Sequence, residues 1–577
     1  MDAAPSWLES VSLSNLSSSF SLVKAAVVNP SSGKTQIAVP LLATAGVYVA
    51  IAVMQRLYSY WRSSIRTMMG PPNGSLLLGN VQELMDDFET TNRWRRQFGH
   101  IFKFKSLMSA THIHVQDIKA INHMIHNMPI YQKAPYGLHN SKRTLGNGLL
   151  AVENDEHKRQ RKILNQAFAP SQIRLLTETF LNISVQCRDM WLAQFAKDPN
   201  ADHQVIDIFD WFRKLTLDVI GQAGFGYDMD ALEVKGQPNE LNDVLTKIFH
   251  APHSRMLMGF MILQAMVPAF RLIPFPGTHV FVECKNETFR IGGEILQRAK
   301  DTLFQTGAER VEVGSKRSVL SLLLRANVNP EIPVSQRLTD DEVIAQIPTL
   351  IVAGHESTSS AVSWAVSFLA GDQARQNKLR EELQGLPEVP TMDELNNAEY
   401  LEQVVRETLR MHPSLVFTQR MAMQEDVLPL GKPYIDANGK THDSIYVTKG
   451  QMIHIPLLAV NNDPEIWGPD AHVFNPERWD KTPEAVNAIP GVWANTLAFF
   501  GGPHACIGYR FALAEIKSIL FVMLRTFEFS HVNTEAGPLG GMACKAAMIP
   551  GGSMLQHPMD LNAPEKGSCL PVKVKLL

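Results

Sequence analysis

The 577-residue sequence is poor in cysteine, and its cysteines form no regular pattern. There are five, Cys187, Cys284, Cys506, Cys544 and Cys569, and no two of them make a CxxC pair. A disulfide framework needs an even set of cysteines, and a structural zinc site needs closely spaced ligands, so we expect neither. Four of the five are expected to be either small apolar residues or reduced surface thiols, which leaves Cys506.

The sequence also has no large excess of positive or negative charge. The chain has 54 basic and 57 acidic residues and a formal net charge of -3, which argues against nucleic acid as the main partner. No flavin or dinucleotide fingerprint, internal repeat or long low-complexity tract is visible. Hydrophobic residues make up 45% of the chain, as in a globular protein with a large core. Without a linker to divide it, one large domain behind an N-terminal extension is the simplest prediction.

One uncharged apolar run stands near the N-terminus. Ile37–Met54 is about 18 residues long, just enough to cross a bilayer. Arg56, Arg62 and Arg66 follow it, and this basic bias places the bulk of the protein on the cytoplasmic side. The alternatives are a buried core helix or a cleaved signal peptide, although a signal peptide has a shorter apolar stretch nearer the first residue. We expect a permanent single-pass anchor.

The remaining boundaries follow from composition. Residues 1–36 are rich in serine and are predicted to be disordered and lumenal. Asn15 begins a glycosylation sequon there, and its occupancy stays open. Gly70–Gly74 contains two prolines and two glycines, which cannot continue a helix. We therefore predict a linker with a stiff hinge over 55–75 and one domain over 76–577.

The most informative stretch surrounds Cys506. Glycines and a proline form a tight loop before the cysteine, and an apolar, helix-forming run follows it. Free N–H groups and the dipole of that helix are expected to lower the pKa of the thiol. Gly502 and Gly508 flank the cysteine without side chains, so a flat macrocycle could approach the backbone. The alternative is a buried structural cysteine in a glycine-rich loop.

The spacing Phe499-x-x-Gly502-x-x-x-Cys506-x-Gly508 resembles the haem-binding signature of the cytochrome P450 family. The resemblance implies haem b with Cys506 as the ligand of the iron, and Phe499, Gly502 and Gly508 as residues of the cofactor site. The family usually has arginine two residues before the cysteine, where this chain has His504. Some members carry histidine there, and the resemblance implies that His504 bonds a haem propionate.

A second motif consists of three charged residues. Glu407 and Arg410 lie three apart in a helical run that ends before Pro413, so they share one face. Such a pair alone is weak, because most are exposed, but apolar neighbours here suggest burial. Arg478, in a Pro-Glu-Arg-Trp sequence, adds a third partner. The set resembles the Glu–Arg–Arg triad of the family, whose role is structural.

A third motif lies within a long predicted helix. Thr339 and Glu342 fit a capping box, and the apolar pattern then continues for about 30 residues to Gly371. Pro348 is expected to kink this helix or to free a carbonyl. In its middle, residues 353–358 read Ala-Gly-His-Glu-Ser-Thr. The segment resembles the distal helix of the family, which opens locally for dioxygen.

By that resemblance, Glu356 and Ser357 align with the acid–alcohol pair that relays protons, and Thr358 is placed with them at the catalytic centre. Ser357 stands where threonine is commoner, and it keeps the hydroxyl group. The alternative for Ser357 is a hydroxyl bonded back to a helix carbonyl. His355 is expected to be a packing or surface residue and not a ligand.

Other contacts with the haem are implied by the same resemblance. His157 and Arg161 look like the family's Trp-x-x-x-Arg helix with histidine in place of tryptophan, and Arg420 lies where the family often has a further arginine. All three are assigned to the haem propionates, although a solvated basic face remains the alternative for His157. The basic residues predicted to dock an acidic reductase are Lys158, Arg159 and Lys162.

The substrate pocket is the least defined part of the prediction. By resemblance it is lined by Leu415, Val416, Phe417 and parts of Tyr131–Leu149 and Gly537–Ser553. Met256–Phe270 is strongly apolar and is either an access lid that dips into the membrane or an ordinary core helix.

The resemblance covers nearly all of the chain beyond Gly70 and implies a mainly α-helical fold with small β-sheets (α+β), most like the fungal microsomal members. It implies hydroxylation or epoxidation of an apolar small molecule such as a terpenoid or xenobiotic. Electrons would come from NADPH through a separate NADPH–cytochrome P450 reductase, with cytochrome b5 as a second candidate donor, at the endoplasmic reticulum membrane with a cytosolic catalytic domain. Two alternatives are a reductase-independent haem-thiolate isomerase or dehydratase and a non-catalytic membrane haem protein.

Overall fold

The structure is a computed structural model. It describes residues 46–47, 51, 54, 64–86, 89–198, 200–233, 264, 278–306, 318–328, 332–532, 542–549, 553–560 and 566–577. The chain divides into two units, Met1–Thr67 and Met68–Leu577. The first unit contains a short 3-10 helix, η1 (Ser64–Arg66). No helix in the described part of the chain has the length and apolar composition needed to cross a bilayer.

Several predicted segments lie outside the described residues. The segment 1–36, with Asn15, is one of them. Of the predicted anchor, 37–54, only positions 46, 47, 51 and 54 are described, and of Met256–Phe270 only Gln264 is. The anchor, the sequon and the lid therefore stay predictions.

Helices make up most of the second unit, and its strands form small sheets, which confirms the predicted mainly helical fold class. Its α-helices are α3 (Val81–Asp86), α4 (Glu89–Phe98), α5 (Ile118–His126), α6 (Pro135–Leu145), α7 (Asn154–Ala167), α8 (Pro170–Arg174), α9 (Thr177–Phe195), α10 (Ile208–Val219), α13 (Thr278–Thr306), α14 (Val319–Val328), α15 (Asp340–Ala370), α16 (Gln373–Gln384), α17 (Met392–Asn397), α18 (Glu399–Met411), α19 (Leu457–Asn461), α20 (Pro464–Trp467) and α21 (Tyr509–Thr526). Its strands are β1 (Ile101–Lys105), β2 (Thr111–Val115), β3 (Tyr131–Gln132), β4 (Gln204–Asp207), β5 (Thr418–Ala422), β6 (Asp426–Ile435), β7 (Thr441–Val447), β8 (Met452–Ile455), β9 (Phe527–His531), β10 (Met542–Ile549), β11 (Ser553–Asp560) and β12 (Pro571–Leu576).

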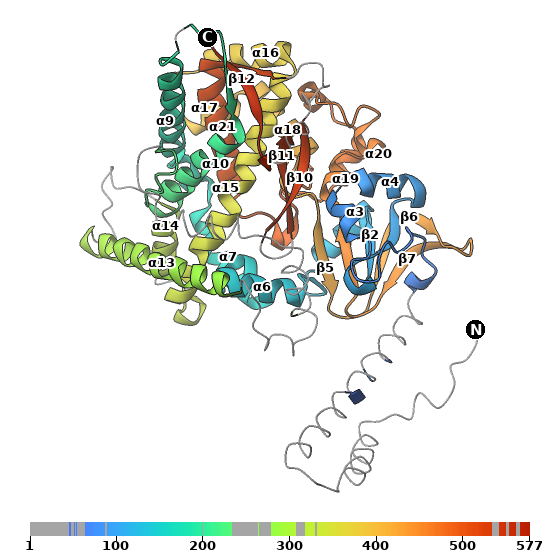
Figure 1. The fold of residues 1–577 in the computed structure, drawn as a ribbon. Coiled ribbons are helices and arrows are strands. Elements are labelled where there is room, and N and C mark those ends of the chain that lie inside the picture. The colour runs from blue at the N-terminus through green and yellow to red at the C-terminus, as the bar shows by residue number, and fades with distance from the viewer. Residues whose placement is uncertain are drawn as a thin grey trace, which may run out of the picture. The chain divides into compact units, whose positions relative to one another are not determined.

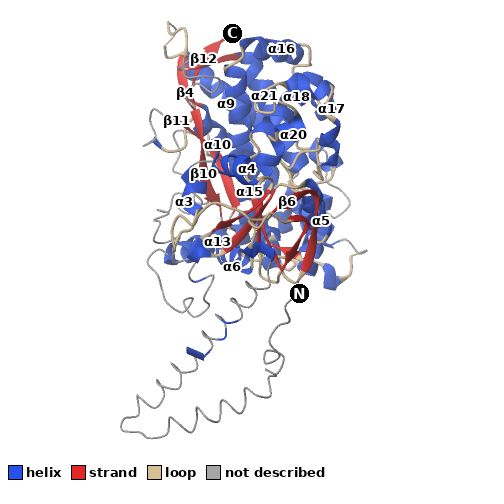
Figure 2. Ribbon diagram, turned by 90° about the vertical axis from the view of Figure 1, so that its right-hand side faces the viewer, coloured by secondary structure: helices blue, strands red, loops and turns tan. Residues whose placement is uncertain are grey.

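The described strands form four small sheets. One has the order β1-β2-β8-β5-β3 and another the order β4-β12-β9, while β6–β7 and β10–β11 are two-stranded. In the first sheet β2 and β8 run parallel, and the other pairings are antiparallel. The helices fill the middle of the unit, and the strands lie toward its margins (Figure 2). Most of the site residues are held by helices and the loops between them, while Arg420 lies on β5.

The long predicted helix is α15, which crosses the middle of the unit beside α10 and α21 (Figure 1). Thr339 and Glu342 form the expected capping box, and the helix ends at Gly371 as predicted. It continues through Pro348 without a break. The helix is buried on most of its circumference by other helices and by β9 and β11. This burial agrees with the many apolar and small residues in its sequence.

The predicted Pro/Gly hinge is attached to the first sheet. The Lys103 N–H donates to the Met69 carbonyl at 2.9 Å, and the Asn80 side chain donates to Pro72 O at 2.9 Å. A Cβ atom at Gly70 would lie 1.8 Å from the carbonyl oxygen of Lys103, so only glycine fits there. Here the structure differs from the predicted linker over 55–75, because the chain from Met68 onward belongs to the second unit.

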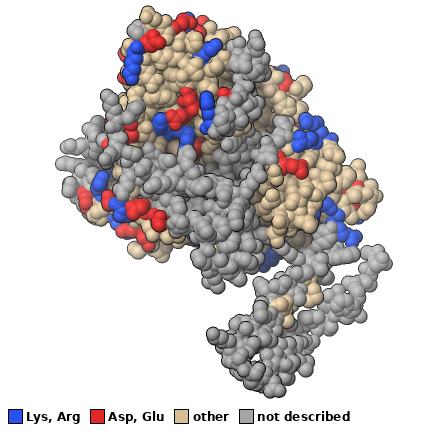
Figure 3. Space-filling view, in the orientation of Figure 1, with Lys and Arg blue, Asp and Glu red and all other residues tan. Residues whose placement is uncertain are grey.

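Charges of both signs share the visible surface. On the face shown in Figure 3, acidic and basic side chains lie interspersed over the described residues. This distribution agrees with the near-zero net charge of the sequence.

Three histidines are buried together in the first sheet. His112, His114 and His454 lie on β2 and β8, where His114 is in register with His454. The His114 ring stacks on Phe102 with centroids 4.2 Å apart, and its Nδ1 lies 3.3 Å from Nδ1 of His454. Burial lowers the pKa of His112 to about 4 and that of His114 to about 3, and it also lowers the pKa of His454. These rings are therefore neutral in the folded protein at ordinary pH.

We predict that replacing His114 with Phe flattens the pH dependence of stability below pH 6.5. The unfolded chain protonates this histidine near its ordinary pKa of 6.5, whereas the folded protein does not. Stability is therefore complete above that pH and falls as pH falls toward the folded pKa, by about 1.4 kcal/mol per pH unit. Phe keeps a ring on Phe102 and does not titrate. Urea unfolding at a series of pH values measures the slope.

The control for this prediction is the exposed His126, changed to Gln. Its side chain meets solvent before and after unfolding, so the slope should match that of the unchanged protein. An unaltered slope in the His114→Phe protein would contradict the prediction.

Candidate functional site

The loop around Cys506 is held by its own backbone. It follows the 3-10 helix η9 (Gly502–His504) and leads directly into α21. The Cys506 N–H donates to the Phe499 carbonyl at 2.9 Å, which closes the loop predicted from the sequence. Phe500 and Gly502 both have positive φ, 56° and 64°. The chain thus reverses sharply just before the cysteine.

The thiol of Cys506 is accessible to solvent although protein surrounds it. Burial raises its pKa, and the Gly508 N–H and the Arg161 guanidinium lower it by less. The expected lowering by the helix start is therefore present, but desolvation outweighs it. A bound metal ion would remove this obstacle, because a coordinating thiol loses its proton outright.

The structure gives its own reason for glycine at position 502. A Cβ atom there would lie 2.4 Å from the side chain of Ile125 on α5, and the backbone has positive φ. At Gly508 a Cβ atom would meet only Phe168, at an ordinary distance of 3.8 Å. Packing against α5 therefore requires Gly502, independently of any macrocycle.

The predicted propionate ligands His157 and His504 lie together. Their rings stack with centroids 4.1 Å apart and planes 9° from parallel. His504 Nε2 lies 2.7 Å from Glu153 Oε2, and Lys133 Nζ lies 3.7 Å from Glu153 Oε1. Although burial raises it, the partners His504 and Lys133 bring the pKa of Glu153 down to about 2. Sequence reasoning missed Lys133 and Glu153 as partners, because they come from separate segments with no motif.

Arg420 and Arg161 complete this basic group. Arg420 is buried, its guanidinium lies 5.0 Å from the Phe500 ring, and it donates to Thr418 and Gln419. Arg161 donates to the carbonyl oxygen of Ala505, next to the cysteine, at 2.7 Å.

Burial lowers the pKa of Arg420 to about 10 and that of Lys133 to about 8. Among the described residues, the carboxylate set against these buried cations is Glu153. A buried excess of positive charge beside an accessible thiol fits the two carboxylates and the iron of haem.

The predicted triad is assembled in the structure. Arg410 donates from Nε and Nη2 to the two oxygens of Glu407, each at 2.8 Å, and both side chains are fully buried. Arg478 Nε donates to Glu407 Oε1 at 3.3 Å and binds Asp470. The Trp479 indole and the Asn475 N–H also donate to Glu407.

The triad is linked to the cysteine loop. Arg410 Nη1 donates to the Asn461 carbonyl at 2.9 Å, and the Asn461 side chain accepts from the Leu497 N–H at 2.8 Å. Leu497 is two residues before Phe499, whose carbonyl accepts from Cys506. The buried charges are therefore coupled to the position of the thiol through three hydrogen bonds.

Most α15 residues that are not buried lie on one stripe of the helix. This holds for the described residues after Val343. Leu350, Ala353, Gly354 and Ser357 follow the i, i+3, i+4, i+7 spacing of a helix face, while the residues around them are buried. This stripe includes Ser357 and excludes Glu356. These residues form the part of the α15 surface that the neighbouring elements leave accessible.

Glu356 points into a cluster of basic groups. Arg213 on α10 donates to Glu356 Oε1 from Nη2 at 2.8 Å and from Nε at 3.0 Å. His355 Nε2 lies 3.3 Å from the same oxygen, and His557 Nε2 on β11 lies 3.0 Å from Oε2. Burial raises the pKa of Glu356, but these partners hold it well below its ordinary value. Sequence reasoning missed Arg213 and His557, which no motif marks.

Ser357 and Thr358 differ in their surroundings. The Ser357 hydroxyl donates to the Ala353 carbonyl at 2.6 Å, which is the alternative considered for it. Thr358 is buried off the open stripe and interacts with Glu515 of α21, so the structure does not place it with Ser357. His355 is buried, with Nδ1 2.8 Å from the Ile351 carbonyl, as expected for a packing residue.

The remaining predicted residues are dispersed. Arg159 is paired with Glu342, while Lys158 and Lys162 are exposed. Val416 is buried, the Phe417 ring lies 4.4 Å from that of His454, and Leu415 forms an isolated bridge with Leu555. Of the predicted pocket segment Gly537–Ser553, positions 542–549 and 553 are described.

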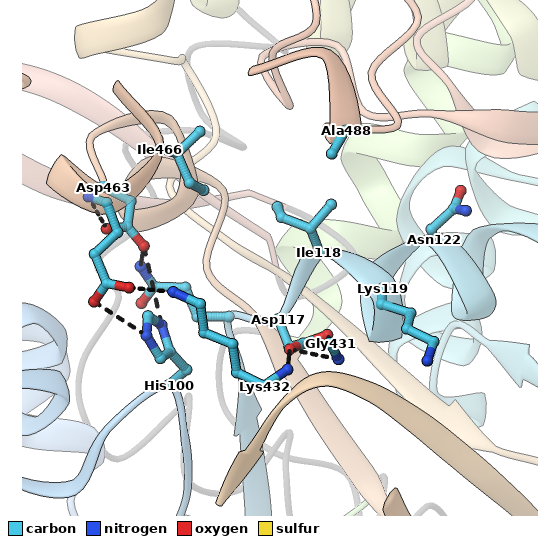
Figure 4. Close-up of a pocket in the computed structure, with 12 residues that line it drawn as sticks. His100, Asp117, Ile118, Lys119, Asn122, Gly431, Lys432, Asp463, Ile466 and Ala488 are labelled. Atoms are coloured by element: carbon cyan, nitrogen blue, oxygen red, sulfur yellow. Dashed lines mark hydrogen bonds and ion pairs between the residues drawn. The ribbon is translucent and has the colours of Figure 1, made fainter. Parts of the chain in front are cut away.

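A separate pocket of about 540 Å³ lies beside α5 (Figure 4). Its charged groups are already paired within the protein. Asp117 accepts from the N–H groups of Gly431 and Lys432, and Asp463 binds Arg95. None of its lining residues is a predicted site residue. This pocket is therefore distinct from the cysteine site. Its lining residues are His100, Gln116, Asp117, Ile118, Lys119, Asn122, Gly431, Lys432, Asp463, Glu465, Ile466 and Ala488.

Comparison with known proteins agrees with this geometry. The family model described as Cytochrome P450 matches residues 69–551. The chain is 39% identical over 557 residues to Cytochrome P450 monooxygenase 205 of Postia placenta, covering 94% of this chain and 99% of that protein. It is 39% identical to Cytochrome P450 monooxygenase 128 of the same fungus, covering 92% and 96%. It is 32% identical to Cytochrome P450 monooxygenase claO of Ampulloclitocybe clavipes, covering 81% and 87%.

We predict that Glu407→Gln lowers the free energy of unfolding by about 3–5 kcal/mol, because it leaves the fully buried guanidinium of Arg410 without its counter-charge and removes one of the two carboxylate partners of Arg478. The matched control is Asp393→Asn, which breaks an exposed pair with Arg174 and should cost less than about 1 kcal/mol. Urea unfolding of both variants measures the difference. A similar loss in the two proteins would contradict a special role for the buried group.

Proposed function

The chain belongs to the cytochrome P450 family of haem-binding monooxygenases, and from this premise we propose that Cys506 is the thiolate ligand of the haem iron. The observation that carries the proposal is an accessible Cys506 thiol beside a buried excess of positive charge. When bound, the haem supplies activation of dioxygen, which thiolate ligation favours. The proposed reaction inserts one oxygen atom into an apolar small molecule, with electrons from NADPH delivered by a separate reductase.

The basic group would orient the cofactor. Arg161, Arg420, His157 and His504 would bind the propionates, together with Lys133. Arg420 supports this role best, because it is buried and its own contacts are with a hydroxyl, a carbonyl and an aromatic face. A propionate would give its guanidinium a carboxylate partner, which it matches in geometry and charge.

Phe499, Gly502 and Gly508 would shape the loop that holds the cofactor. Phe499 does so through its carbonyl, which accepts from the Cys506 N–H. Gly502 does so through the close approach of α5. Gly502 therefore serves the loop first and the cofactor through it.

Glu356 and Ser357 would deliver protons to the oxygen site. Ser357 lies on the open stripe of α15, so its hydroxyl can turn from the Ala353 carbonyl toward a bound molecule. Glu356 is adjacent in sequence and is held as a carboxylate by Arg213, ready to accept a proton and pass it on. Thr358 is not part of this proposal, because it is buried against α21.

The proposed protein partners follow from exposed lysines on the surface, and the proposed membrane attachment follows from the apolar segment near the N-terminus. Lys158 and Lys162 are exposed, so they would meet an acidic reductase or cytochrome b5, whereas Arg159 is already paired with Glu342. The apolar segment 37–54 would anchor the protein in the endoplasmic reticulum membrane, with the domain in the cytosol. An apolar substrate of the terpenoid or xenobiotic kind is proposed from the apolar residues that the family resemblance assigns to the pocket.

We predict that Cys506→Ser abolishes the red-shifted absorption band of the ferrous–carbonyl complex, because a hydroxyl is not a thiolate donor. Cys569→Ser is the matched control. Cys569 is buried, its N–H donates to the Pro558 carbonyl of β11, and it does not lie in a loop like the one around Cys506. Difference spectra of the reduced proteins with carbon monoxide measure the band. Its retention in the Cys506 variant would refute the ligand assignment.

We predict that Glu356→Gln and Ser357→Ala each slow NADPH oxidation by the enzyme with its reductase, on the order of 10²-fold, and raise the share of dioxygen released as hydrogen peroxide. Both variants remove a step of proton delivery. Thr349→Val is the control, because its hydroxyl bonds back to Ala345 O in the same helix outside the relay. Oxygen and peroxide electrodes measure both quantities, and unchanged ratios would remove the relay role.

A further inference from the structure

The two oxygens of Glu356 have different surroundings. Oε1 accepts two hydrogen bonds from Arg213 and also lies near His355. No hydrogen bond within the described part of the chain reaches Oε2, whose charged-group contact is His557 Nε2 at 3.0 Å. A proton arriving at Glu356 would therefore bind at Oε2, where it does not compete with the guanidinium.

The groups at Oε1 are unsuited to supply that proton. Arginine does not release its protons in proteins. The other ring nitrogen of His355, Nδ1, lies 2.8 Å from the Ile351 carbonyl, which accepts a proton in a hydrogen bond but has none to give. His355 therefore cannot receive a replacement proton from the Ile351 carbonyl. Of the three partners of Glu356, this leaves His557 as the proton donor.

His557 is fixed by its neighbours on β11. Its ring centroid lies 5.0 Å from that of Phe209 on α10, and its Nδ1 lies 3.3 Å from the Ser568 hydroxyl. Ser568 is held beside the strand by a bridge to Met559 and by the hydrogen bond from Cys569 N to Pro558 O at 3.1 Å. The imidazole therefore joins Ser568 at one nitrogen to Glu356 at the other.

Exposure increases along this line. Glu356 is 2% exposed and His557 is 9% exposed, while Ser568 is half-buried and Lys566 is exposed. The line therefore runs from a buried carboxylate toward solvent in two contacts. A proton path needs this gradient together with groups that both accept and release protons.

We propose that His557 is a positioning residue that passes protons from Ser568 to Glu356 Oε2. The inference rests on the proposed role of Glu356 in proton delivery and extends that path to the surface. In each transfer the Nε2 proton of His557 moves to Oε2 while a proton from the Ser568 hydroxyl binds Nδ1, and solvent returns the proton of Ser568. The ring is then protonated on Nδ1, and it regains the starting tautomer before the next transfer by losing that proton through Ser568 and taking up a proton from solvent at Nε2.

The groups that face the path are few among the described residues. Arg213 from α10 and His355 from α15 face Glu356, and Phe209 from α10 packs on His557. Arg213 holds Glu356 anionic and lowers its proton affinity, so a proton received at Oε2 is readily passed on toward the oxygen site. The path therefore predicts a specific tautomer for His557, with the proton on Nε2 and Nδ1 accepting from Ser568.

The first test is the tautomer. Nitrogen-15 spectra of the histidine-labelled holoenzyme should show an imidazole with Nε2 protonated and Nδ1 as the acceptor, and His557→Gln should remove that signal. A ring protonated on Nδ1 alone overturns the proposal, because it has no proton to give Glu356. This measurement does not depend on turnover.

The second test compares two substitutions. Gln places an amide N–H where Nε2 lies, so it keeps the contact with Glu356 and cannot pass a proton, and Phe keeps only the packing. We expect His557→Gln to slow NADPH oxidation with the reductase at least about tenfold, less than the loss of a direct proton donor, and to raise the solvent isotope effect. If Gln behaves as the unchanged enzyme and only Phe is impaired, the role is structural and the proposal fails.

The matched control is His531→Gln. His531 is also buried against α15, where its Nε2 lies 2.9 Å from the Ser367 carbonyl, three turns away from Glu356. It should leave rate and isotope effect unchanged. The ferrous–carbonyl band distinguishes a failure of the proposed function from a failure of this inference alone. If the unchanged protein lacks the band, the proposed function fails, whereas a normal band with normal turnover in His557→Gln overturns this inference alone.

Discussion

The buried carboxylate of Glu407 is the constraint on which the site depends. An ionised carboxylate without solvent is costly unless every oxygen is bound to a donor, and here Arg410, Arg478, Trp479 and a backbone N–H surround it. Arg410 in turn binds the carbonyl of Asn461, whose side chain holds Leu497. The cysteine loop cannot shift without disturbing one of these bonds. Apolar packing alone would tolerate small sliding motions, but directional bonds to a buried charge do not.

A similar cost shapes the basic group beside the thiol. Burial lowers the pKa values of Lys133 and Arg420, which means that their charges are held in the protein at a free-energy cost. A bound dianionic cofactor would remove much of that cost, and a ligand that binds only the folded state raises its stability. The residues that orient the cofactor therefore also couple its binding to folding.

Local patterns in the sequence were sufficient for features that lie within one element or one loop. The capping box at Thr339, the end of α15 at Gly371 and the pairing of Glu407 with Arg410 each depend on residues a few positions apart. The joining of Glu153 with Lys133 and His504, and of Glu356 with Arg213 and His557, depends on how distant segments pack, and no spacing records it. The sign of the pKa shift at Cys506 has the same origin, because burial competes with the helix start and only the fold decides the balance.

Two buried glutamates on or beside α15 have opposite environments. Glu356 is surrounded by Arg213 and two histidines, which hold its pKa well below the ordinary value. Glu515 of α21 is just as buried and interacts with Thr358, and burial raises its pKa well above the ordinary value. The first is therefore a carboxylate and the second a neutral acid at the same pH. Glu515 therefore keeps its proton, whereas Glu356 binds one weakly and releases it readily to an acceptor nearby. The different proton affinities follow from which neighbours each carboxyl group has, since both side chains are almost fully buried.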